Sequence, residues 1–186
     1  MKLTNTPERF GTVAIALHWV MALAIFGLFG VGWYMVDLTY YDELYKTLPF
    51  YHKSVGITLA AVLLFRIVWK LMNPTPKPLA GSSSFEKFAA KAAHLLIYVL
   101  LLAIVFSGYL ISTADGLPIS VFDWFFVPAS ITGIPEQEDI AGFVHEYLAY
   151  ALMALVAVHA AAALKHHFFD NDDTLKRMLG TAPRSD

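Results

Sequence analysis

The stretch GTVAIALHWVMALAIFGLFGVGWYMV, residues 11–36, contains no charged side chain and a single histidine. About 20 apolar residues in a helix cross the roughly 30 Å of a bilayer's hydrocarbon core, so this stretch predicts a membrane-spanning helix. It is longer than the apolar core of a cleavable signal peptide, and no small-residue cleavage site follows it before Asp37. We therefore expect residues 11–36 to remain in the mature protein.

Three further apolar runs have the length of a membrane span: residues 50–72, 88–112 and 140–164. In lipid each backbone segment must satisfy its own hydrogen bonds, which favours helices, and the alternating pattern of a membrane β-barrel is absent. The sequence therefore predicts an all-α fold, an integral membrane four-helix bundle. We expect one membrane domain over residues 1–186 with a tail at 165–186. The aromatic run 121–127 is expected at the membrane interface as a short helix or wedge.

The composition agrees with a membrane protein and excludes several other classes. Hydrophobic residues make up 58% of the 186 residues and charged residues 15%, whereas a soluble domain has about 25% charged residues. The formal net charge of −2 offers no basic patch for nucleic acid. The absence of cysteine excludes thiolate metal sites, iron–sulfur clusters and covalent c-type haem attachment.

Lysine and arginine are unevenly distributed between the segments that flank the four spans. The first and third connections hold two of them, Lys46 and Lys53. The other flanks hold ten: Lys2, Arg9, Lys70, Lys77, Lys87, Lys91, Lys165, Lys176, Arg177 and Arg184. Because basic loops stay on the cytoplasmic side, we expect both termini to face the cytoplasm.

Four histidines in the predicted spans fall into two pairs at matching depth. His145 and His159 are fourteen residues apart in the fourth span, which places them about 21 Å apart along a helix and about 40° apart around it. His52 is expected at the depth of His145 on the outer side, and His18 at the depth of His159 on the cytoplasmic side. Two such bis-histidine sites are typical of a di-haem b-type cytochrome.

A second pattern favours these four histidines. Each is followed, four residues later, by a side chain small enough to leave room for a flat macrocycle: Ala22, Gly56, Ala149 and Ala163. His94, in the third span, is followed by Tyr98 instead. A lone membrane histidine is more often a packing or pore residue, but four in matched pairs favour metal or haem. Zinc would need a third or fourth ligand at one level, and no intramembrane carboxylate joins His18, His94 and His159, so haem fits better.

Three further residues are candidates for cofactor contacts. Arg66 lies fourteen residues after His52 on nearly the same helix face and could pair with a haem propionate, or else snorkel to lipid headgroups. Lys53 could serve the outer propionates or attract an anionic donor, although a plain interfacial lysine would look the same. His94 could contact a propionate or a quinone, or simply pack between helices.

Several short segments carry a family resemblance: IALHW (15–19), HKSVG (52–56), FRIVW (65–69), PTP (74–76), HLLIY (94–98), VHE (144–146), LVAVHAAAAL (155–164) and KHH (165–167). With them, nearly the whole chain resembles the bacterial four-helix di-haem cytochrome b561 family. The resemblance implies iron ligands at His18, His52, His145 and His159 and two non-covalent haem b groups. It implies an electron carrier of the bacterial cytoplasmic (inner) membrane that passes electrons to ubiquinone, and a superoxide:ubiquinone oxidoreductase acting on superoxide at the outer side.

Two other functions remain open. A cytochrome b subunit that anchors a hydrogenase or dehydrogenase in a larger complex would share these histidines, and only the third connection, 113–139, offers docking surface for it. A non-haem proton-coupled transporter would use the histidines as a proton relay, but its broken helices are not expected here. The acidic outer loops should repel superoxide unless Lys46 and Lys53 form a local positive entrance.

Overall fold

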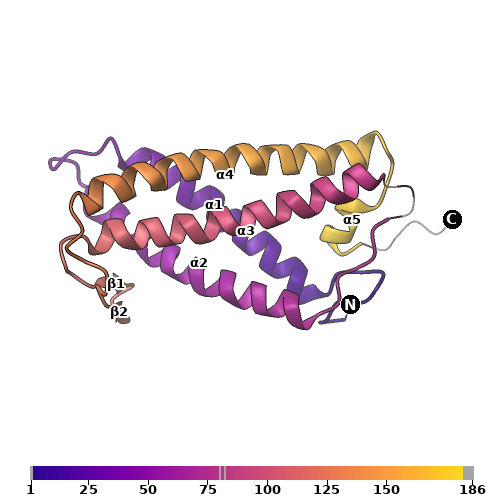
Figure 1. The fold of residues 1–186 in the computed structure, drawn as a ribbon, viewed down its shortest axis with the longest axis horizontal. Helices are drawn as coiled ribbons and strands as arrows, with labels where there is room; N and C mark the ends of the chain where they lie inside the picture. Colours follow the sequence, from indigo (N-terminus) through magenta and orange to yellow (C-terminus); the bar gives the residue numbers. More distant parts are fainter. Residues whose placement is uncertain (1, 80, 82, 182–186) are drawn as a thin grey trace. The chain divides into compact units, whose positions relative to one another are not determined.

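The computed structural model describes residues 2–79, 81 and 83–181. Its four long helices are α1 (Thr12–Met35), α2 (Thr47–Met72), α3 (Ser84–Thr113) and α4 (Gln137–Phe168) (Figure 1). All four are long and apolar enough to cross a membrane, as predicted. Helices α3 and α4 begin before the apolar runs at 88 and 140, since helical hydrogen bonding continues through the polar residues that precede them.

The chain divides into two compact units, and each long helix contributes a part to both. The terminal unit comprises residues 1–20, 64–99 and 152–186, and therefore contains both ends of the chain. The hairpin unit comprises residues 21–63 and 100–151. Each unit thus draws on all four long helices, so histidines that are distant in sequence can meet within one unit.

The hairpin unit is named after a two-stranded antiparallel sheet, β1 (Ile119–Val121) and β2 (Phe125–Val127), in the third connection. The prediction of a short helix at 121–127 was therefore wrong, whereas the placement of this aromatic run at the membrane interface as a wedge stays a prediction. Alternate residues of a strand point to opposite faces, and Ile119 and Val121 are both buried while Ser120 between them is not. This inward pair fixes the segment as a strand, whereas Trp124 in the turn stays 81% exposed.

Ser54 of α2 fastens this hairpin to the helix. Its fully buried hydroxyl donates to the Phe50 carbonyl at 2.8 Å and accepts the backbone N–H of Phe122 at 3.1 Å. Phe122 and Asp123 form the turn with φ of 51° and 59°, a left-handed conformation that is uncommon for residues other than glycine. The hydrogen bond from Phe122 to Ser54 therefore helps to hold a turn that its own residues disfavour.

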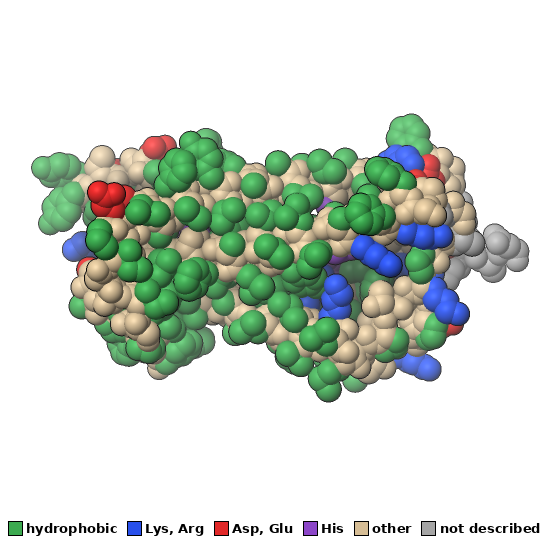
Figure 2. Space-filling view, in the orientation of Figure 1, with side chains coloured by type: hydrophobic (Ala, Val, Ile, Leu, Met, Phe, Trp, Pro, Cys, Tyr) green, Lys and Arg blue, Asp and Glu red, His purple; other side chains and the backbone are tan. Residues whose placement is uncertain are grey.

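The distribution of buried and exposed apolar side chains is the one expected of a protein surrounded by lipid. The buried side chains of the hairpin unit include residues from all four helices: Met21, Leu59, Leu63, Leu101 and Ala141. Many larger apolar side chains face outward, among them Trp33 at 68% and Phe143 at 62% exposure. Figure 2 shows hydrophobic side chains spread over the face in view. Such a surface suits contact with hydrocarbon rather than water.

Within the segment expected as a tail, α4 continues to Phe168 and a short helix, α5 (Thr174–Leu179), follows it. Helix α5 ends at Gly180, whose φ of 72° is the left-handed conformation that glycine commonly supplies after a helix. At the other terminus, Gly11 lies so close to the backbone of Leu3 that any side chain at position 11 would collide with it. Gly11 and α5 both belong to the terminal unit.

Candidate functional site

In the hairpin unit, helices α2 and α4 bring His52 and His145 together. The centres of the two imidazole rings are 6.3 Å apart, and the ring planes are inclined by 70°. Imidazole nitrogens bind metal ions at about 2.0–2.1 Å, so imidazoles on opposite sides of one metal ion have ring centres about 6 Å apart. The observed separation fits a bis-histidine metal site.

The ring of His145 is oriented by the backbone of α3. Its Nδ1 lies 2.9 Å from the carbonyl oxygen of Ile104 and 3.1 Å from the hydroxyl of Ser107. Because a carbonyl only accepts hydrogen bonds, the ring proton lies on Nδ1 and donates to Ile104. The lone pair of Nε2 is then available to a metal, an arrangement typical of ligating histidines.

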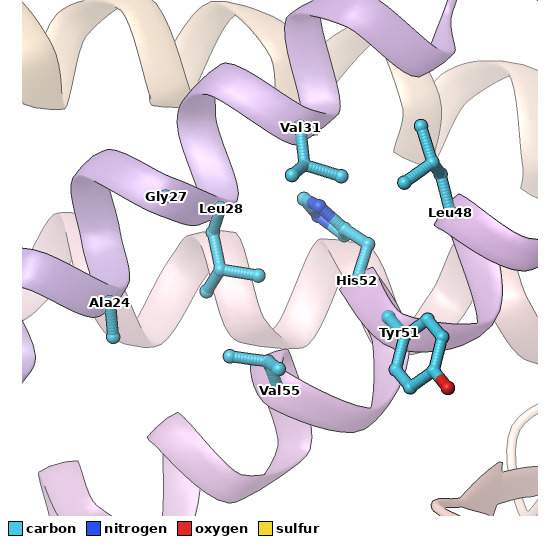
Figure 3. A pocket seen from close by; sticks show the side chains of 8 residues that line it. All are labelled: Ala24, Gly27, Leu28, Val31, Leu48, Tyr51, His52 and Val55. Carbon is cyan, nitrogen blue, oxygen red and sulfur yellow. The ribbon is translucent and has the colours of Figure 1, made fainter.

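The ring of His52 borders an apolar cavity of about 230 Å³ (Figure 3). The lining residues are Ala24, Gly27, Leu28, Val31, Leu48, Tyr51, His52 and Val55. Figure 3 shows the imidazole pointing from α2 toward Val31 of α1, with Tyr51 turned away from it. Nδ1 of His52 is buried and has no hydrogen-bond partner among the described residues. An apolar cavity bordered by an imidazole fits a flat, largely apolar cofactor such as haem.

Two glycines that the sequence reasoning did not identify lie against these rings. A Cβ at Gly108 of α3 would lie 3.0 Å from Cε1 of His145, and one at Gly32 of α1 would lie 3.2 Å from Cε1 of His52. Neither ring could keep its place beside a larger residue. At Gly56, which the sequence did single out, an added Cβ would meet nothing within 4 Å, so that position has open space as a macrocycle beside His52 would need.

In the terminal unit, three imidazoles converge from α1, α3 and α4. The ring centres of His18 and His159 are 6.3 Å apart, with the planes inclined by 60°. The ring centres of His94 and His159 are 5.3 Å apart. The first pair repeats the separation found in the hairpin unit. The second pair is closer than two ligands on opposite sides of one metal ion would be.

Positive charge lies beside these imidazoles. Nη2 of Arg66 donates to Nδ1 of His18 at 3.3 Å, and the guanidinium carbon lies 5.7 Å from the ring centre of Tyr98. The Lys70 ammonium lies 4.9 Å from the same ring. Figure 2 shows basic side chains around a recess in this unit, with histidine atoms visible inside. Such a recess suits an anionic group, for example a carboxylate.

Lys53 and a cluster of Glu86, His166 and Asp170 are two further sets of polar residues. Lys53 follows His52 directly and is exposed. Ligand atoms of Glu86, His166 and Asp170 lie within 4.8 Å of one another. Because the Lys165 ammonium lies 2.8 Å from Asp170 and 3.5 Å from Glu86, an internal cation already neutralises those carboxylates.

Comparison with known proteins identifies the family. The family model described as prokaryotic cytochrome b561 matches residues 9–181. Cytochrome b561 homolog 2 of Escherichia coli (strain K12) is 51% identical over 180 residues, which cover 97% of this chain and 96% of the relative. Cytochrome b561 homolog 1 of the same strain is 27% identical over 92% of this chain and 97% of its own length. The probable superoxide oxidase CybB of Yersinia pestis is 25% identical over 92% of this chain and 96% of its own length. This chain therefore belongs to the prokaryotic cytochrome b561 family, which confirms the resemblance and the membrane helical bundle that the sequence predicted.

Proposed function

We propose that this chain binds two haem b groups, one held by His52 and His145 in the hairpin unit and one by His18 and His159 in the terminal unit. As a member of the cytochrome b561 family, the chain is a haem b protein of the membrane that transfers electrons. The observation that carries the proposal is the ring-centre separation of 6.3 Å, which is the same in both pairs. When bound, haem would supply one-electron oxidation and reduction, and two histidine ligands on one iron would favour electron transfer over oxygen binding.

The residues around the histidines would neutralise and orient the cofactors. Arg66 and Lys70 supply positive charge to the carboxylates of the haem in the terminal unit. We assign Lys53 the same role at the hairpin unit, where it also attracts an anionic donor. His94 supplies a polar group to a haem carboxylate or to a quinone carbonyl.

The reaction we propose oxidises superoxide on the outer side of the bacterial inner membrane and reduces ubiquinone. Each superoxide loses one electron and becomes dioxygen, so two of them reduce one ubiquinone, which also takes up two protons. The similarity to a protein named as a probable superoxide oxidase supports this donor. The excess of basic residues in the flanks of the chain ends supports an orientation with both termini in the cytoplasm.

Two measurements on the purified protein test this function. The ratio of haem to protein is expected to be two per chain, and a lower ratio would refute the two-haem proposal. In stopped flow, superoxide should reduce the haems faster than a soluble one-electron donor of similar potential. Equal rates for the two donors would remove the superoxide assignment and leave an electron carrier with another donor.

A further inference from the structure

The short helix α5 contacts a residue beside one of the proposed iron ligands. The indole Nε1–H of Trp19 donates to the backbone carbonyl of Met178 at 2.7 Å, across 159 positions of sequence. The ring centre of Trp19 lies 5.2 Å from that of His18, and the planes meet at 80°. An edge-to-face contact of this kind favours one relative orientation of the two rings. Trp19 therefore links α5 to the imidazole of His18.

Helix α5 is tied to the rest of the terminal unit at a second point. Nη1 of Arg177 donates to the Lys77 carbonyl at 2.8 Å, and the backbone N–H of Lys77 donates to the Pro7 carbonyl at 2.8 Å. Asn5 adds a bond from its side-chain amide to the Pro74 carbonyl at 3.0 Å. We call these three segments, residues 5–7, 74–77 and 174–180, the terminal clasp.

The order of α5 depends on these bonds rather than on the helix itself. An isolated helix shorter than about 12–15 residues is marginal in water, and α5 has six. The last carbonyls of any helix lack partners within it, and the indole of Trp19 satisfies the carbonyl of Met178 in the last turn. Loss of the Trp19 bond should therefore free the indole ring and loosen α5, which Arg177 still ties to Lys77.

We propose that Trp19 is a positioning residue for His18 and that the terminal clasp holds its indole in place. The inference rests on the proposed function, because it treats His18 as an iron ligand. The ring orientation of an axial histidine and its access to water tune a haem's potential and spectrum. The clasp thus acts on the haem of the terminal unit alone.

Replacement of Trp19 by phenylalanine tests this in the full-length, haem-loaded protein. Trp19→Phe keeps an aromatic ring beside His18 and removes the N–H donor. We expect full haem content, with a shift in the low-spin electron paramagnetic resonance g-values and the midpoint potential of the terminal-unit haem, and no shift for the other haem. A His145→Ala background, which retains only the terminal-unit haem under the proposed function, assigns the signals.

Trp69→Phe is the matched control. The indole N–H of Trp69 is buried in the same unit and has no hydrogen-bond partner among the described residues, so this variant should leave both haem signals unchanged. Gly180→Val disturbs the terminal clasp at the end of α5, because a β-branched residue disfavours the φ of 72° found at this position. It should shift the same haem as Trp19→Phe, and the double variant should shift it no further.

The outcomes separate the two proposals. Wild-type g-values and potentials in a fully loaded Trp19→Phe protein would refute the positioning role while leaving the di-haem function intact. Equal shifts of both haems would refute it as well, since the clasp lies within one unit. A wild-type protein without haem would refute the proposed function and this inference together.

Discussion

The two units each gather histidines from different helices, yet they hold the imidazole Nδ1 atoms in opposite ways. In the hairpin unit, Nδ1 of His145 donates to a backbone carbonyl of Ile104. In the terminal unit, Nδ1 of His18 accepts from the guanidinium of Arg66. A neutral imidazole carries one ring proton, so the two histidines are opposite tautomers. His145 already presents Nε2 for a metal, whereas His18 does so only when Arg66 donates elsewhere.

Under the proposed function, this difference would give the two units different parts in cofactor binding. The backbone carbonyl of Ile104 is fixed by the helix, so the hairpin unit has a preorganised ligand. The guanidinium of Arg66 sits on a flexible side chain and can turn from His18 to an anionic group. Under the proposed function, a carboxylate bound by Arg66 would compete with His18 for the guanidinium.

The largest expected effect comes from removal of one histidine from each unit. His145→Ala should lose the hairpin-unit haem and keep the other, and His159→Ala should do the reverse, because each leaves one iron with a single protein ligand. Haem content and the spectrum of each purified variant measure this. His94→Ala serves as the control and should retain two haems. Loss of a haem from that variant would contradict the assignment of the terminal-unit ligands to His18 and His159.

The next largest effect is expected from substitution of Gly108, which lies beside His145. Gly108→Ala places a methyl group 3.0 Å from Cε1 of the imidazole, and crowding of this kind costs about 1–3 kcal/mol. The hairpin-unit haem should dissociate more readily while the terminal-unit haem is retained, as measured by transfer of haem to apomyoglobin. Gly142→Ala is the control, since its Cβ would meet nothing within 4 Å. Equal retention in both variants would mean that His145 has room to move.

Ser54→Ala should loosen the hairpin of the same unit. The variant leaves the half-buried N–H of Phe122 without its acceptor, and an unsatisfied polar group costs about 1–3 kcal/mol when it is fully buried. Faster hydrogen exchange is expected at 119–127, with residues 174–180 unchanged. Ser130→Ala, also in the third connection, is the comparison because only its backbone N–H takes part in the bonds described here. Faster exchange in both units would mean that Ser54 stabilises more than the hairpin.

The smallest effect concerns Asp42, in the first connection. The side-chain hydroxyl of Thr39, and then its backbone N–H, lower the pKa of the Asp42 carboxyl below its usual 3.8. The turn is therefore stabilised above that pH and loses the stabilisation as the pH falls through the lowered pKa. Thr39→Val should bring the pKa back toward 3.8, as followed by NMR titration. A pKa unchanged by this substitution would assign the shift to the backbone N–H alone.

The sequence predicted the four long helices and part of the surroundings of the histidines. Long, predominantly apolar runs of about 20 residues or more determine helices in lipid, and a fourteen-residue spacing indicated that Arg66 shares a helix face with His52. Arg66 indeed contacts His18. The hairpin was missed because its turn uses Phe122 and Asp123 in place of the Asn-Gly pair that would signal one.

Other contacts depend on how neighbouring helices are aligned, which one sequence does not specify. The small residues we considered lay on the same helix as each histidine, whereas Gly32 and Gly108 lie against histidines of other helices. Helix α5 has too few residues for a periodic pattern, and its bond to Trp19 spans almost the whole chain. Ligation of iron by these histidines stays a prediction.

Helix α4 joins His145 and His159 by continuous helical backbone. Insertion of one residue between them would change the angle between the two histidines around the helix by about 100°, and insertions close to whole turns, such as about seven or eleven residues, would nearly restore it. The connections between helices have no such constraint on length. The number of residues between the two histidines of α4 is therefore restricted, and we expect few insertions or deletions in this stretch among members of the family.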